Sequence, residues 1–189
     1  MTQSIIFRAT FVVILALYPF IIYFGIRVLP PSFFGFALAV LLLIRFGFVR
    51  PEERASALPA LVLLLAYAVT TAVLGSTRML LYYPALVNFL LCALFASSLR
   101  QDEPLLLRIM RARGITMHAR IPPYLARLTA VWAVFLALNG TIAVWTTTAS
   151  IEIWTIYNGI ISYALIAALV LGEWLYRRHY KRKHGIPGE

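Results

Sequence analysis

The sequence contains little of what a catalytic or disulfide-stabilised protein needs. It has one cysteine, Cys92, which excludes an intramolecular disulfide, and only seven acidic residues among 189. It has no glycine-rich phosphate-binding loop, no nucleophile elbow and no HExxH zinc motif. His179 and His184 are five residues apart in a charged tail, a spacing that does not suit a metal site. We therefore expect no cofactor and no metal, and the sequence leaves catalysis open but favours a non-enzymatic protein.

Polar sequence is scarce as well, because 62% of the residues are hydrophobic and the mean hydropathy is +0.86. Soluble domains are only about 45–50% apolar. The apolar residues fall in stretches of about 17–25, the length that crosses a bilayer as a helix. The first stretch is too long for a signal peptide and is followed by no small-x-small cleavage site. These features predict an all-α, polytopic membrane protein.

The apolar stretches predict six transmembrane helices within a single transmembrane domain, residues 1–189. The polar breaks between them include Pro30-Pro31, after which Ser32 could cap the second helix. The stretch 100–127 is expected to be a cytoplasmic segment between the fourth and fifth helices, and 177–189 a basic cytoplasmic tail. The predicted helices cover residues 5–26, 33–49, 58–74, 79–99, 128–147 and 153–176.

Basic residues are distributed unevenly between the two sides of this arrangement. Of the 17 lysines and arginines, all but Arg27 and Arg78 fall on the side that holds both termini. The positive-inside rule then places the N-terminus and the C-terminus in the cytoplasm of an inner (plasma) membrane. The net charge of +10 is therefore mostly a topology signal. No folded basic domain presents these charges, so we expect no nucleic-acid partner.

Several polar and aromatic residues lie inside the predicted spans. Trp132, Phe135 and Asn139 are spaced i, i+3 and i+7, which puts them on one helix face. An amide in hydrocarbon is costly without a partner. Two interpretations stay open: interhelical hydrogen bonding, or a polar pocket that opens toward the outer leaflet. The residues expected to form these contacts or this pocket are Asn88, Trp132, Asn139, Trp154, Tyr157, Asn158 and Ser162.

Gly140 and Gly159 each follow an asparagine inside these apolar stretches. They could allow two helices to approach closely, or the Asn-Gly pair could soften the helix locally.

The segment that follows the fourth predicted helix has the pattern of an interfacial helix. In "EPLLLRIMRAR", Leu106, Ile109 and Met110 lie along one side of a helix, and the arginines lie around the other. We expect the apolar side to face the acyl boundary and the arginines to contact lipid head groups. The alternative is a basic topological anchor without lipid recognition. The arginines concerned are Arg108, Arg111 and Arg113.

The second half, about residues 80–176, resembles a known family through the motifs "YYPALVNF", "PLLLRIMR", "WAVFLALNG" and "WTIYNG". It is similar to the small inner-membrane proteins encoded in aryl polyene and related fatty-acid-type gene clusters of Gram-negative bacteria. A more distant similarity is to the intracellular septation protein A family, which more often has a Phe-Lys pair where this chain has "YNG". The resemblance implies an inner-membrane protein of envelope biogenesis and carries over no catalytic residue.

From these observations we expect a non-catalytic or lipid-handling component of aryl polyene or envelope lipid assembly. Two alternatives are a small transporter or flippase of an amphipathic lipid intermediate, and a membrane enzyme that acts on an acyl chain. "YPFIIYF" at 18–24 is similar to "YPALVNF" at 83–89, which would suit the inverted repeats of transporters but can also arise by chance. The expected partners are membrane phospholipids, with other envelope or lipid-assembly proteins as further candidates.

Overall fold

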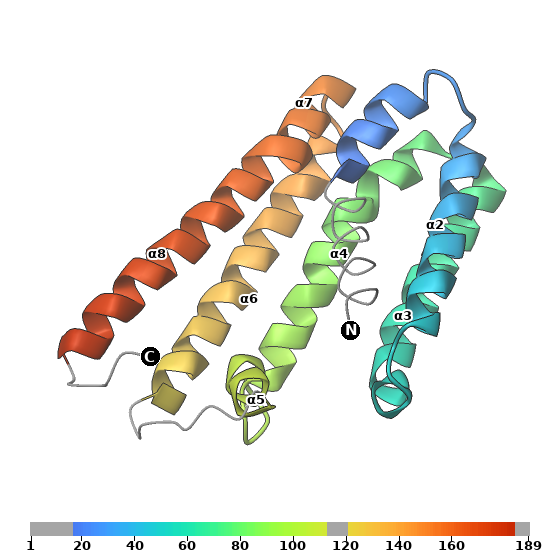
Figure 1. Ribbon diagram of the computed structural model, residues 1–189. Coiled ribbons are helices and arrows are strands. Elements are labelled where there is room, and N and C mark those ends of the chain that lie inside the picture. Colours follow the sequence, from blue (N-terminus) through green and yellow to red (C-terminus); the bar gives the residue numbers. More distant parts are fainter. Residues whose placement is uncertain (1–16, 113–120, 184–189) are drawn as a thin grey trace. The chain divides into compact units, whose positions relative to one another are not determined.

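The computed structural model describes residues 17–112 and 121–183, and all regular structure in these ranges is helical. Residues 17–25 form the end of a first helix. Figure 1 shows the helices that follow. They are α2 (Pro31–Gly47), α3 (Pro51–Leu74), α4 (Thr77–Ser98), α5 (Leu105–Ala112), α6 (Ile121–Thr146), α7 (Ile151–Ile156), the π-helix η1 (Tyr157–Ile161) and α8 (Ser162–Lys183).

The described residues confirm the all-α class, and four of these segments are long and apolar enough to cross a membrane, which is consistent with a multi-pass membrane protein. Helix α2 is apolar but has only 17 residues, and the first predicted helix lies partly outside the described residues. Large apolar side chains cover much of the surface, including Phe36 at 66% and Val73 at 78% exposure. Exposed apolar surface on this scale suits contact with lipid rather than water. The four segments are Arg54–Leu74, Thr77–Ser98, Ile121–Thr146 and Ile151–Tyr180.

Several helices begin nearer to the N-terminus than predicted, because prolines occupy their first turns. α2 starts at Pro31 and has no side-chain cap, so the predicted capping role of Ser32 is wrong. α3 starts at Pro51 rather than residue 58, and α6 already includes Ile121 and the residues after it, ahead of the predicted start at residue 128. Proline suits the first turn because the N–H that it lacks would have no intrahelical acceptor there. The predicted segment 100–127 therefore contains α5 and the first turns of α6.

The described residues form two compact units. The first contains residues 17–83 and 145–159. Within it, α2 and α3 pack closely, because a Cβ atom at Gly35 would lie 2.4 Å from the backbone nitrogen of Ala72. Only glycine allows this approach of two helix backbones. The core of this unit comprises Ile22, Phe34, Leu80, Leu81 and Trp154.

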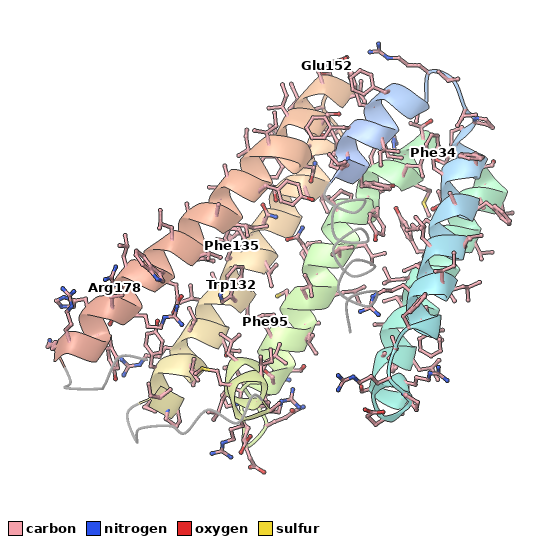
Figure 2. The ribbon with its side chains drawn as sticks, viewed as in Figure 1. Phe34, Phe95, Trp132, Phe135, Glu152 and Arg178 are labelled. Carbon is pink, nitrogen blue, oxygen red and sulfur yellow. The ribbon has the colours of Figure 1, made fainter. Side chains whose placement is uncertain are left out.

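The second unit contains residues 84–112, 121–144 and 160–183. α6 and α8 run side by side in it (Figure 1). α4 and α6 meet where the rings of Phe95 and Trp132 lie 6.3 Å apart, and Phe135 meets Trp132 edge to face (Figure 2). These ring contacts join α4 to α6, and α5 contacts α6 through the cluster of Leu107, Tyr124 and Leu125.

The apolar side of α5 packs in part on α6. Leu107 is 5% exposed and forms a cluster with Tyr124 and Leu125 of α6. Leu106 and Met110 join this cluster, whereas Ile109 is 41% exposed. Leu106 and Met110 thus stay partly exposed while they pack against α6, and the expected orientation of this side toward the acyl boundary remains a prediction. Burying Leu107 and its neighbours against α6 removes the same apolar surface from water that the membrane boundary would have covered.

Candidate functional site

A groove of about 400 Å³ lies between α6 and α8 in the second unit. The lining residues of each helix are three or four positions apart, so they lie on one helix face. Tyr124, Arg127, Leu128 and Val131 on α6 face the lining residues of α8 across the groove. The volume falls within the range of about 300–1,000 Å³ that is typical of small-molecule sites. The lining residues are Pro123, Tyr124, Arg127, Leu128, Val131, Ala168, Leu169, Gly172, Glu173, Tyr176 and Tyr180.

Charged and hydroxyl groups meet in this groove around Glu173. The Tyr124 hydroxyl donates a hydrogen bond of 2.8 Å to Glu173 Oε1. Arg177 Nε lies 3.4 Å from the same oxygen, and the i, i+4 spacing on α8 places the two side chains on one helix face. Arg127 also lines the groove, and no described carboxylate pairs with it. The groove therefore offers one carboxylate and one guanidinium that has no ionic partner among the described residues.

Three tyrosine rings line the groove. The ring centroids of Tyr124 and Tyr180 lie 5.1 Å apart, and those of Tyr124 and Tyr176 lie 6.1 Å apart. Tyr124 belongs to the cluster that contains Leu107 of α5, and Tyr180 packs against this cluster. Tyrosines of this kind are typical of membrane interfaces, where one end is apolar and the other polar. The packing of α5 therefore supports two of the rings that form the groove.

The groove changes from polar to apolar along its length. Leu128, Val131, Ala168 and Leu169 form one part, and the charged residues and tyrosines form the other. At 1.5 Å per residue the lining spans about 12 Å of α6 and about 18 Å of α8. Half of the hydrocarbon core is about 15 Å thick. The groove therefore matches one leaflet in length, with its polar end toward the basic end of α8.

The predicted polar residues divide into two clusters, of which one belongs to the second unit. Asn139 is 3% exposed, and its Nδ2 donates to Asn88 Oδ1 at 3.0 Å and to Ser162 Oγ at 2.8 Å. Asn88 in turn donates to the carbonyl of Pro84 at 2.8 Å. A Cβ at Gly140 would lie 3.1 Å from Asn88 Cβ, so this glycine allows the close approach of α4 and α6. One hydrogen-bonded cluster thus joins α4, α6 and α8.

The other cluster belongs to the first unit and centres on Asn158, which is 5% exposed. Its Nδ2 donates to Thr146 Oγ1 at 3.1 Å and to the Trp154 carbonyl at 2.9 Å. Trp154 is fully buried and donates from Nε1 to the Leu81 carbonyl at 2.9 Å. Tyr157 is buried as well, and it begins the π-helix η1. Asn158 and Gly159 thus lie in a π-helical turn, whereas Asn139 and Gly140 lie in the α-helix α6.

All buried side-chain nitrogen and oxygen atoms of the described residues have hydrogen-bond partners. The amides of both clusters are therefore satisfied by the protein itself. Trp132, also predicted here, instead packs on Phe95 of α4 (Figure 2). This pattern matches interhelical hydrogen bonding in membrane bundles.

The three arginines predicted to contact head groups have different surroundings. Arg108 is exposed on α5. Arg111 forms an ion pair with Glu103. Arg113 lies outside the described residues.

Our reading of the sequence missed the groove, although its signal is visible there. Tyr124, Arg127 and Val131 have helical spacing, as do Leu169, Glu173, Tyr176 and Tyr180. Each stripe alone has the ordinary pattern of a membrane-interface helix end. Only the facing arrangement of α6 and α8 turns the two stripes into a cavity.

No protein-family model, curated protein or solved structure matches this chain.

Proposed function

We propose that this chain is a multi-pass inner-membrane protein that holds an amphipathic phospholipid in the groove between α6 and α8. The observation that carries this proposal is the combination of an apolar wall with Arg127, a guanidinium without a described ionic partner, in a cavity of about 400 Å³. Arginine binds phosphate through a planar fork of donors, and the apolar wall suits an acyl chain. The matched length of groove and leaflet supports the same ligand.

We further propose six spans, with both termini in the cytoplasm. The positive-inside bias supports this orientation. It places Arg127 and the basic end of α8 at the cytoplasmic head-group level, where arginine side chains are stable. The residues up to about 25 and α2 would then supply the first two spans.

A role as a lipid-handling component of envelope biogenesis, such as aryl polyene lipid assembly, rests on the resemblance of the second half alone. We favour a protein that holds a lipid in one leaflet over the alternative of a flippase, which moves a lipid across the membrane. A flippase needs polar groups that can receive a head group in the membrane interior. The buried amides of Asn88, Asn139 and Asn158 are already occupied by hydrogen bonds within the protein.

The variant Gly172→Leu tests the groove directly. A Cβ at Gly172 would meet no atom within 4 Å, so a leucine fits without a clash and projects into open space beside the groove lining. We expect folding to be retained, because leucine has a higher helix propensity than glycine by roughly 1 kcal/mol. We expect the amount of co-purified phospholipid, measured by native mass spectrometry, to fall several-fold.

Gly47→Leu is the matched control. Gly47 also has open space around its Cβ position, but it lies at the end of α2 and does not line the groove. This control should retain lipid as the unsubstituted protein does. Equal lipid retention in both variants, with both folded, would contradict a lipid site in the groove.

A further inference from the structure

We infer that the groove selects a zwitterionic phospholipid whose head group carries a primary ammonium. In this arrangement Arg127 binds the phosphate and Glu173 accepts from the ammonium. The inference rests on the proposed lipid-binding function and adds the class of head group. It is carried by two opposite charges on facing walls of one cavity.

The carboxylate of Glu173 has acceptor capacity left. Both described donors, the Tyr124 hydroxyl and Arg177 Nε, reach Oε1. No described residue donates to Oε2, and a carboxylate can accept about four hydrogen bonds. A primary ammonium brings three N–H donors, which suits this free oxygen. A quaternary ammonium has no N–H to donate.

Glu173 also discriminates against head groups that carry only negative charge. Its side chain is 16% exposed, so its charge is screened less than that of a fully exposed group. An anionic head group bound at Arg127 would bring negative charge into the same cavity. Arg177 balances the charge of Glu173 in part, so the discrimination comes from the ammonium contact: an ammonium beside Glu173 is attracted, whereas a head group without a cation gains no such contact.

The aromatic rings favour a cation as well. Tyr124, Tyr176 and Tyr180 line the same groove as Glu173. A cation within about 6 Å of a tyrosine ring centroid is attracted by the negative face of the ring. The rings do not distinguish primary from quaternary ammonium, so the preference for the primary form depends on Glu173.

The test measures lipid selectivity of the full-length protein in nanodiscs. These contain equal amounts of phosphatidylethanolamine, phosphatidylcholine and phosphatidylglycerol with identical acyl chains. Native mass spectrometry after release from the nanodisc reports the lipid that stays bound. We expect phosphatidylethanolamine to be retained about tenfold over the other two, the ratio expected for one hydrogen bond to a charged group.

Glu173→Gln should remove this preference, because the amide keeps an oxygen for the Tyr124 hydroxyl but lacks the charge. Glu152→Gln is the matched control: it makes the same chemical change at an exposed carboxylate that does not line the groove, so it should keep the preference. Arg127→Gln should lower retention of all three lipids, because each contains a phosphate.

A preference for phosphatidylglycerol, or an unchanged preference in Glu173→Gln, would overturn the inference. If the head-group preference were absent but Gly172→Leu still lowered the amount of bound lipid, the proposed lipid-binding function would stand without the inferred selectivity. If Gly172→Leu left lipid retention unchanged, the lipid site itself would be wrong. If the Glu173→Gln variant does not fold, a competition experiment on the unsubstituted protein tests the head-group preference instead. Glycerophosphoethanolamine should displace bound lipid at lower concentration than glycerophosphoglycerol or inorganic phosphate, and equal potency would overturn the inference.

Discussion

At the residue scale, the buried amides stabilise helix contacts in this structure. Asn139 donates to acceptors on two other helices, Asn88 on α4 and Ser162 on α8. An amide left without a partner in hydrocarbon costs several kcal/mol, whereas each interhelical bond in a membrane contributes about 0.6 kcal/mol and at most about 1.7 kcal/mol. The penalty therefore requires that Asn139 has a partner, while the bond itself adds modest stability.

A double-mutant cycle tests the pair. We expect Asn88→Ala and Asn139→Ala each to lower the free energy of unfolding. We expect the coupling between them to be about 0.6–1.7 kcal/mol, because the two side chains share one hydrogen bond. The measurement is reversible unfolding in detergent micelles. Thr141→Val is the control, because the exposed Thr141 hydroxyl bonds only the Ala137 carbonyl of its own helix among described residues. Strict additivity of the two alanine substitutions would contradict the bond.

At the element scale, α4 depends on donors from other segments near its proline. Pro84 has no N–H, so the Leu80 carbonyl lacks its usual helical donor. The Tyr18 hydroxyl donates to this carbonyl at 3.0 Å. The neighbouring carbonyls of Met79 and Leu81 also accept side-chain hydrogen bonds, from Tyr67 and Trp154. The first turns of α4 are thus held by three donors from outside the helix.

This arrangement predicts that the effect of Tyr18→Phe depends on residue 84. In the natural background the substitution leaves a part-buried Leu80 carbonyl without its donor and should cost about 1–3 kcal/mol. In a Pro84→Ala background the alanine N–H can bond the Leu80 carbonyl, so the same substitution should cost much less. Thermal unfolding in detergent, calibrated by chemical denaturation, measures both.

Tyr82→Phe serves as the control for this cycle. No described residue bonds the Tyr82 hydroxyl, and its loss should matter equally little in both backgrounds. An equal cost of Tyr18→Phe with and without Pro84 would show that the hydroxyl does not replace the missing donor.

At the scale of the whole molecule, the proposed topology follows from charge. The loop between α6 and α7 contains no lysine or arginine, and the end of α8 contains a basic run from Arg177 onward. The positive-inside rule then separates these two ends across the membrane. The α6–α8 groove has its polar part toward the basic end.

Reporter fusions test this topology. An alkaline phosphatase fusion at Ser150 should be active, because it would lie in the periplasm. Fusions after Met110 and at the C-terminus should be inactive as phosphatase and fluorescent as green fluorescent protein, because both sites would be cytoplasmic. Phosphatase activity of the fusion after Met110 would contradict the proposed number of spans and the placement of the groove.

The sequence by itself determined the class of this protein, because the signals for it are local. Composition and the length of apolar runs predicted a helical membrane protein, and these properties need no knowledge of neighbours. The i, i+4 pair of Glu173 and Arg177 was also predictable, since both lie on one helix face. The helices α2 and α3 begin before the predicted positions, because proline favours the first turn of a helix and polar side chains can also occupy that turn.

Only the tertiary structure decided which polar groups meet. Desolvation requires that each buried amide has a partner, but it does not specify the partner. Asn139 therefore bonds Asn88 and Ser162. Asn158 has the same Asn-Gly context and lies in the π-helix η1, but it bonds Thr146 of α6 and the Trp154 carbonyl of α7. The α6–α8 groove depends in the same way on how two helices are rotated about their axes. Packing of side chains from several segments sets that rotation, and no single stretch of sequence contains it.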